Sequence, residues 1–257
     1  MLEKEEIERI SKIKNLTLKN TERDYLLEVL LFIIIKETGK KLIFKGGTAL
    51  YKFYSLNRFS EDLDFTLVSK ISIDKLTKKI ILKLNDINIK VKIKELNEYK
   101  NQKNIKLELK GPLFNGSVNT LSLVTIDISL KEKPIYPAEQ KTIFPQYRDI
   151  PSFNVFLMPL SELLAEKIRA LLTRDKARDV YDVWFLLNKG IKFNIEEINK
   201  KLRVYKKKFN INEFIVNSIF HFVKLYINNM VYLIFSKWMK DNNFINSIKK
   251  FWLELFS

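Results

Sequence analysis

Two alternating aspartates in the segment RFSEDLDF are the side chains of this sequence best placed to do chemistry. A β-strand projects alternate side chains on one face, so Asp62 and Asp64 would lie together on a polar face. The stretch LSLVTIDISL shows the same alternation and places Asp127 among polar neighbours. If these two strands pair, three carboxylates converge on a site for a divalent cation. Such a cluster suits two-metal phosphoryl or nucleotidyl transfer. A lone Asp-x-Asp is weak evidence for this chemistry, because exposed acidic strands are common.

Adjacent glycines, Gly46 and Gly47, precede these aspartates and are followed by Thr48. The chain has only six glycines in 257 residues, so a pair marks a place where the backbone geometry demands them. A short apolar strand at 42–44 leads into the pair, and we predict that Thr48 caps a helix running to about Tyr54. Backbone amides at this point could approach a triphosphate, and the Thr48 hydroxyl could donate to a phosphate oxygen. A tight turn with a helix cap, without any ligand, is the alternative interpretation.

The counts of cysteine and histidine and the length of the apolar stretches exclude several classes of protein. There is no cysteine and one histidine, His221, which excludes disulfides and a Cys/His zinc site. A metal would have to be held by carboxylates, which favours Mg²⁺ or Mn²⁺. The longest apolar stretch, 25–35, is interrupted by Glu28 and falls short of the ~20 residues that cross a bilayer. With its charged first residues, the chain is expected to be cytoplasmic, with no membrane partner.

The formal net charge of +16 indicates a polyanionic partner such as nucleic acid. A composition biased by genome base content is the competing explanation, because Lys, Asn and Ile are abundant together. Arginine is more telling, since Arg169, Arg174 and Arg178 fall within ten residues of a chain that has few arginines. The rigid guanidinium fork holds phosphate or carboxylate through two hydrogen bonds, which lysine cannot do. The cluster therefore suggests that an anionic group is held here in a defined orientation.

Proline divides the sequence into two parts, because all six prolines lie between 112 and 159. We predict an N-terminal α/β domain over residues 1–150 and a helical domain over residues 151–257. Within the first domain the patterns predict helices at 3–14, 21–37 and 73–85, and strands at 61–68, 87–94, 105–109 and 121–130. The 87–94 strand should have a buried face and a lysine face.

A second chemistry-bearing segment is LAEKIRALLTRDKARDVYDVWFLL, residues 164–187. Its apolar positions form one helical face that leaves Lys167 and Arg169 partly outside it. We predict that Asp175 caps the next helix and that Arg178 pairs with Asp182 at i+4. A salt-bridge network that holds two domains together is one interpretation of this cluster.

The two segments FKGGTALYKFY and RFSEDLDF together resemble the nucleotidyltransferase toxins of the AbiEii/AbiGii type, which include the MenT-like enzymes of the DNA polymerase β-like nucleotidyltransferase superfamily. The matching positions are Phe44, Gly46, Gly47, Asp62 and Asp64. A lysine between the hydrophobic position and the glycines is usual in this group. The segment at 164–187 looks like the second signature of the family.

The resemblance implies an α+β fold, with a polymerase β-like domain of mixed sheet and flanking helices followed by a helical domain that closes the active-site cleft. It implies transfer of NMP from NTP to an RNA acceptor, the tRNA 3′ end, with release of pyrophosphate. It also implies a cognate antitoxin protein as a partner. The implied metal ligands for Mg²⁺ or Mn²⁺ are Asp62, Asp64 and Asp127. The implied nucleotide ligands are Gly46, Gly47, Thr48, Lys167 and Arg169, and Asp179 would orient Lys167 or an arginine.

Two other functions stay open on the sequence alone. A metal-dependent nuclease is possible because Asp62 or Asp64 with Glu108-x-Lys110 superficially fits a nuclease pattern, although this leaves the glycine pair unexplained. The other is a non-catalytic RNA- or protein-binding module on a transferase fold.

Three further features receive structural or regulatory interpretations. We expect His221 to be a core or helix-face residue, and Trp238 and Trp252 to pack helices together. Ser60 lies two residues before Asp62, so its phosphorylation would place negative charge beside the proposed metal ligands.

Overall fold

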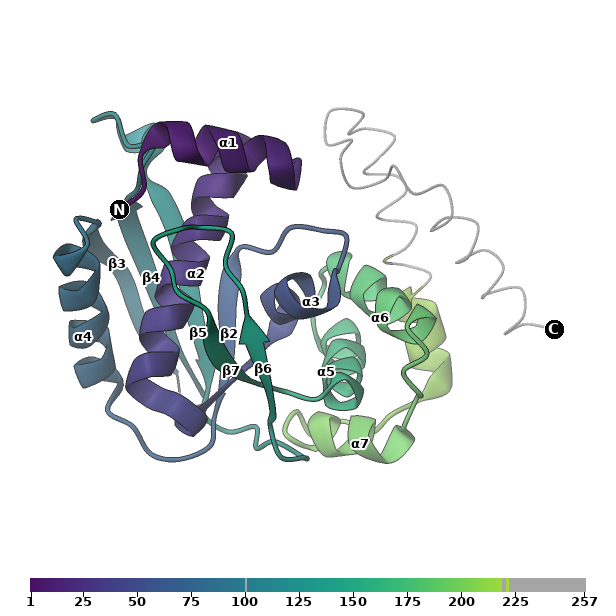
Figure 1. The fold of residues 1–257 in the computed structure, drawn as a ribbon. Helices are drawn as coiled ribbons and strands as arrows, with labels where there is room; N and C mark the ends of the chain where they lie inside the picture. The colour runs from purple at the N-terminus through teal and green to yellow at the C-terminus, as the bar shows by residue number, and fades with distance from the viewer. Residues whose placement is uncertain (100, 219–220, 222–257) are drawn as a thin grey trace. The chain divides into compact units, whose positions relative to one another are not determined.

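The structure is a computed structural model that describes residues 1–99, 101–218 and 221 (Figure 1). The chain divides into two compact units. The first unit consists of Met1–Ser55 and Phe59–Pro159, and the second joins Leu56–Arg58 to the residues from Leu160 onward. In the described part of the chain, no helix has the length and apolar character needed to cross a membrane.

The first unit is built on a seven-stranded mixed sheet with the order β3-β4-β5-β2-β1-β7-β6. The strands are β1 (Leu42–Lys45), β2 (Asp62–Leu67), β3 (Lys90–Tyr99), β4 (Gln102–Lys110), β5 (Ser122–Ser129), β6 (Glu139–Ile143) and β7 (Phe153–Leu157). The pairs β2–β5 and β1–β7 are parallel, and the other neighbouring pairs are antiparallel. The helices are α1 (Lys4–Lys14), α2 (Leu18–Thr38), α3 (Gly46–Tyr54) and α4 (Ile73–Asp86), with short 3₁₀ turns at Gly39–Lys41 and Val118–Thr120. Helices α2 and α4 pack against the same sheet, as Figure 1 shows.

Alternating side chains in the central strands separate the core from a polar face. In β5 every second residue is buried, and Val124, Ile126 and Ile128 are 1% exposed or less. Leu63 and Phe65 of the neighbouring β2 are also fully buried. The predicted strands at 61–68, 105–109 and 121–130 are therefore confirmed, and so is their alternation.

The prediction for the 87–94 strand is only partly right. Strand β3 begins at Lys90 and lies at the edge of the sheet, so Val91 and Ile93 are half-buried, and Ile89 is buried just before the strand. Strands β6 and β7 were not predicted, because they lie in the proline-rich stretch that breaks the expected pattern. The predicted helices at 3–14, 21–37 and 73–85 correspond to α1, α2 and α4.

The second unit contains α5 (Leu160–Thr173), α6 (Arg178–Asn188) and α7 (Ile195–Arg203) among its described residues. Helix α5 packs against both α6 and α7. Lys201 of α7 is buried and its Nζ lies 2.5 Å from Glu162 Oε1 and 3.1 Å from Glu166 Oε1 on α5. Lys201 therefore has a structural role, because it ties α7 to α5. Trp238 and Trp252 lie outside the described residues.

Buried charges fix α3 against α2 in the first unit. Lys52 of α3 pairs with Asp24 and Glu28 of α2, and all three side chains are at most 5% exposed. Asp24 also accepts hydrogen bonds from Lys14 Nζ at 2.6 Å and from the Tyr147 hydroxyl at 2.8 Å. Burial alone would raise the pKa of Asp24, but the charges of Lys52 and Lys14 outweigh burial and lower it. Helix α3, which begins at the glycine pair, is thus held in place by ion pairs.

The substitution Lys52→Met tests this anchor. It keeps a long side chain but leaves two buried carboxylates with less compensation, so the free energy of unfolding should fall by about 3–5 kcal/mol. The control Lys12→Met, at an exposed position of α1, should change it by no more than about 0.5 kcal/mol. Urea unfolding followed by circular dichroism measures both. Equal losses in the two variants would show that the buried ion pairs do not anchor α3.

Candidate active site

Three carboxylates lie on the polar face of the central strands. Strand β2 pairs with β5 in parallel, and in this register Asp64 is the partner of Asp127 while Asp62 is the partner of Thr125. Neighbouring strands lie about 4.8 Å apart, and partners in register project on the same face. All three aspartates are half-buried, whereas Leu63 between them is fully buried. The strand pairing that the sequence left conditional is therefore present.

The turn from β1 into α3 brings the backbone against Asp64. Strand β1 pairs with β2 so that Lys45 is the partner of Asp64. Gly46 follows with φ +78°, and a Cβ atom there would lie 2.1 Å from Asp64 Oδ2. Only glycine can occupy this position, because it tolerates the left-handed conformation and leaves room for the carboxylate. The amino end of α3 and the Asp64 carboxylate are consequently neighbours.

Thr48 has a different role from the predicted helix cap. Helix α3 begins at Gly46, with Lys45 as the N-cap residue and no side-chain cap. The prediction of a Thr48 cap is therefore wrong. The Thr48 side chain is fully buried, and its hydroxyl donates to the main-chain oxygen of Asp62 at 2.5 Å. Thr48 thus ties the first turn of α3 to the start of β2.

Two amide side chains of β4 hold Asp127. Gln102 Nε2 and Asn104 Nδ2 each donate to Asp127 Oδ1 at 2.7 Å. Asn104 is the register partner of Asp127 in the antiparallel β4–β5 pair. Neither residue was predicted from the sequence. Gln102 and Asn104 lie two residues apart just before the predicted 105–109 strand, and this polar alternation was the available signal.

A buried lysine lies beside the carboxylates. Lys45 is only 7% exposed, and its Nζ lies 3.4 Å from Glu132 Oε2. Because Lys45 is the register partner of Asp64, its side chain is on the same face of the sheet. Lys45 is the lysine of the glycine motif, and the sequence pattern alone predicted no role for it.

The donor atoms of this face suit a hard divalent cation. Carboxylate oxygens are the ligands that Mg²⁺ and Mn²⁺ prefer. The absent side chain at Gly46 leaves the room that the Asp64 carboxylate occupies. Within the described residues, no three acidic or histidine side chains are yet close enough together to form a metal site. Binding an ion would therefore require Asp62, Asp64 and Asp127 to turn toward one another.

A separate network of buried charges occupies the second unit. Arg58 binds Asp182 through two hydrogen bonds, Nε to Oδ1 at 2.7 Å and Nη2 to Oδ2 at 2.6 Å. Lys167 Nζ lies 2.7 Å from Asp182 Oδ2 and 3.9 Å from Asp179 Oδ1. Arg174 binds Asp179 through two further hydrogen bonds at 2.7 and 2.8 Å. Burial opposes the charge of Asp182, but Lys167 and Arg58 outweigh it and lower the pKa of this carboxyl.

Two local predictions for this segment are wrong. Asp182 pairs with Arg58 and Lys167, not with Arg178 at i+4. Helix α6 has Ala177 as its N-cap residue and no side-chain cap, so Asp175 does not cap it. Asp175 Oδ1 instead lies 3.3 Å from Nδ1 of His221, which is buried, as expected for a core residue.

The structure also shows the surroundings of three further residues for which the sequence suggested a role. The Arg169 guanidinium lies over the Tyr205 ring, 4.9 Å from its centroid. Ser60 is only 6% exposed, so the fold gives a kinase little access to its hydroxyl and does not support the phosphorylation hypothesis. Glu108 pairs with Lys94 at 3.0 Å on the far side of β5 from β2, which argues against a nuclease site formed with Asp62.

Comparison with solved structures shows that this is a nucleotidyltransferase fold. The chain is similar to MenT4, a nucleotidyltransferase toxin from Mycobacterium tuberculosis H37Rv, with a TM-score of 0.60 and 15% identity over 83% of this chain and 77% of that one. It is also similar to JHP933 from Helicobacter pylori, with a TM-score of 0.52 and 19% identity over 84% of this chain and 97% of that one. The predicted α+β, polymerase β-like fold is therefore confirmed.

The family follows from the sequence comparison. A family model described as "Nucleotidyl transferase AbiEii toxin, Type IV TA system" matches residues 30–230. The chain belongs to this family of AbiEii nucleotidyltransferase toxins, which are components of type IV toxin–antitoxin systems. A comparison with curated proteins gives no match.

The close approach at Gly46 generates a prediction with a matched control. Gly46 and Gly116 both have positive φ, +78° and +99°, but a Cβ at Gly116 would meet nothing within 4 Å. Alanine at either position incurs the left-handed penalty of about 1–2 kcal/mol. Gly46→Ala must in addition displace Asp64, so it should lower the free energy of unfolding by at least about 1 kcal/mol more than Gly116→Ala. Urea unfolding measures the difference. Equal losses would mean that Asp64 does not require the glycine.

Proposed function

We propose that the protein transfers a nucleoside monophosphate from an NTP to the 3′ end of an RNA, with tRNA as the acceptor and pyrophosphate as the second product. The observation that carries this proposal is the register pairing of Asp64 with Asp127 beside Gly46 at the start of α3. Family membership supports an NTP substrate and a divalent metal. The net charge of +16 supports a polyanionic acceptor.

In this proposal Asp62, Asp64 and Asp127 hold Mg²⁺ or Mn²⁺. A bound cation would supply charge neutralisation at the phosphates and would lower the pKa of the attacking hydroxyl. The backbone amides at Gly46 and Gly47, at the amino end of α3, favour the negative charge of the triphosphate. Thr48 acts indirectly, because its hydroxyl fixes the backbone of Asp62.

The group transfer forms one bond and breaks one bond. The acceptor hydroxyl oxygen attacks the α-phosphorus, and the bond from that phosphorus to the oxygen bridging to the β-phosphate breaks. Pyrophosphate leaves with the bonding electron pair. The hydroxyl proton passes to the Asp127 carboxylate, whose Oδ1 accepts hydrogen bonds from Gln102 and Asn104.

Lys167 and its neighbours have a proposed supporting role. We assign Lys167 to the charge that develops on the departing pyrophosphate, with Arg169 as a further phosphate contact. The burial of Lys167 and its ion pairs with Asp182 and Asp179 support a fixed position for this ammonium group. The toxin family also leads us to propose a cognate antitoxin protein as a partner, with the reaction taking place in the cytoplasm.

A transfer assay tests the function directly. The protein is incubated with total tRNA, Mg²⁺ and each α-³²P-labelled NTP in turn, and lengthened radioactive RNA is expected with at least one NTP. Asp62→Asn, Asp64→Asn and Asp127→Asn should each lower the rate by at least about 100-fold, because each removes charge stabilisation of several kcal/mol. Asp74→Asn, at an exposed position of α4, is the matched control and should react like the unmodified protein. EDTA should abolish the reaction.

The other outcomes separate the competing functions. Shortened RNA would indicate a nuclease. An absence of product with all four NTPs and with both Mg²⁺ and Mn²⁺ would indicate a non-catalytic module. Full activity in the three asparagine variants would show that the transfer site lies elsewhere.

A further inference from the structure

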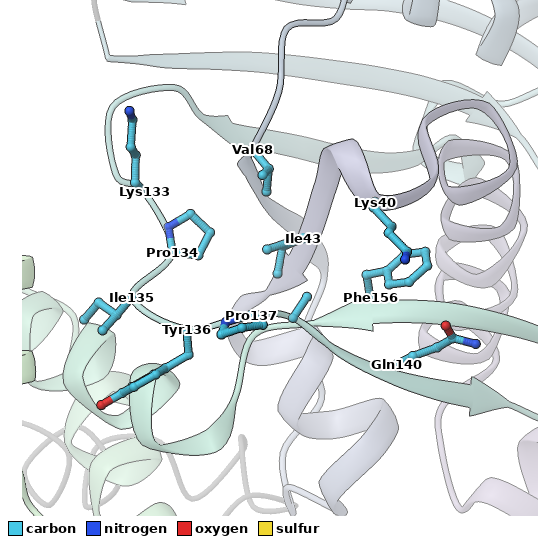
Figure 2. Close-up of a pocket in the computed structure, with 11 residues that line it drawn as sticks. Lys40, Ile43, Val68, Lys133, Pro134, Ile135, Tyr136, Pro137, Gln140 and Phe156 are labelled. Carbon is cyan, nitrogen blue, oxygen red and sulfur yellow. The ribbon is translucent and has the colours of Figure 1, made fainter.

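A pocket of about 670 Å³ lies in the first unit at the end of β1 away from Gly46 (Figure 2). Its floor includes Ile43 of β1 and Val68, which follows β2. The segment at 133–138 forms one wall, and Phe156 of β7 lies on the other side, as Figure 2 shows. The pocket is thus an apolar trough bordered by a proline-containing loop and a sheet strand.

Two lysines lie on opposite sides of this trough. Figure 2 shows Lys133 on the loop side and Lys40 beside Phe156. Both side chains are exposed, and neither has a carboxylate partner among the residues that the structure describes. The Lys40 Nζ lies 5.8 Å from the centroid of the Phe156 ring. The trough therefore combines unneutralised positive charge with an aromatic surface.

The pocket lies on the same face of the sheet as the carboxylates of Asp62, Asp64 and Asp127. Ile43 and Lys45 are two residues apart in β1, so their side chains project on the same side, about 7 Å apart along the strand. Lys45 is the register partner of Asp64. The loop that carries Lys133 is also tied to this place, because Glu132 pairs with Lys45 at 3.4 Å. A ligand in the trough would therefore extend along β1 toward Asp64.

We propose that this pocket binds the single-stranded end of the acceptor RNA, upstream of the nucleotide that receives the NMP. A base stacks on the aromatic side of the trough, and successive phosphates pair with Lys40 and Lys133. Positive charge tracking a backbone, combined with aromatic surfaces for the bases, is how proteins hold single-stranded nucleic acid. Two lysines on opposite sides of a trough suit successive phosphates of a chain better than one compact triphosphate. The inference rests on the proposed function, since it names the place of that acceptor.

The binding test uses a fluorescently labelled RNA stem with a single-stranded 3′ overhang, without NTP or divalent cation. Fluorescence anisotropy gives the affinity at several salt concentrations. The double variant Lys40→Ala/Lys133→Ala should weaken binding at least tenfold and make the slope of log K against log salt shallower by about 1.4, since each phosphate contact on a single strand contributes about 0.7. The control Lys75→Ala/Lys78→Ala removes the same charge from exposed positions of α4 and should leave both quantities unchanged. An equal loss of RNA affinity in both double variants would show that net charge alone governs binding, and the proposal that RNA binds in this pocket would be wrong.

The aromatic part of the pocket has its own test. Phe156→Leu keeps an apolar side chain but removes the ring, so it should weaken RNA binding by about fivefold or more without changing the salt slope. A urea unfolding curve checks that the variant is folded. Unchanged affinity in a folded Phe156→Leu variant would exclude base stacking at this place.

Failure of this inference can be told apart from failure of the proposed function. If the unmodified protein transfers NMP but Lys40→Ala/Lys133→Ala raises only the KM for the NTP, the pocket holds the donor nucleotide and the inference is wrong. If that variant raises the KM for RNA alone, the inference stands. If the protein binds the overhang through this pocket but transfers nothing, the transferase function fails while the RNA site remains.

Discussion

The absence of a side chain at position 46 is the constraint on which the first unit's site depends. Antiparallel pairing of β1 with β2 places Lys45 opposite Asp64, and the positive φ of Gly46 then turns the chain directly into α3. A Cβ at this position would overlap the Asp64 carboxylate. The helix end, with its partial positive charge, and the acidic strand can therefore lie side by side only because this residue is glycine. Thr48 fastens the first turn of α3 to β2, and Lys52 fastens its last turn to α2, so the helix is held at both ends.

Local patterns were sufficient to predict much of this arrangement. Alternation identified β2, β4 and β5 and the side of each strand that is polar, and the rare glycine pair identified the turn at Gly46. Partners far apart in sequence could not be predicted in the same way. The pairing of Asp64 with Asp127 depends on a parallel register between distant strands, and the sequence could state it only as a condition. Arg58 and Asp182 are 124 residues apart, so a search for partners at i+4 selected Arg178 instead. The Thr48 and Asp175 caps failed because the helices begin at residues that no side-chain pattern marked.

The distribution of lysine says more about function than its number does. Lys45, Lys52, Lys167 and Lys201 are buried, and each lies beside a carboxylate. The paired carboxylates offset the charge of these four lysines, which therefore contribute little to the external field of the protein. Lys40 and Lys133 differ, because they flank an open trough without carboxylate partners among the described residues. The excess of positive charge thus includes a local site on the same face as the aspartates, where a polyanion could be recognised by geometry as well as by charge.

The central claim is that Asp62, Asp64 and Asp127 turn toward a common cation beside the amino end of α3. The most direct measurement is a crystal structure with Mn²⁺ and an NTP analogue that has a non-hydrolysable bond between the α- and β-phosphates. The account predicts an anomalous peak for Mn²⁺ bonded to oxygens of Asp62 and Asp64, with Asp127 facing the ion and the triphosphate at the backbone of Gly46 and Gly47. Mn²⁺ and nucleotide bound at another place, with the three carboxylates remaining apart, would contradict it.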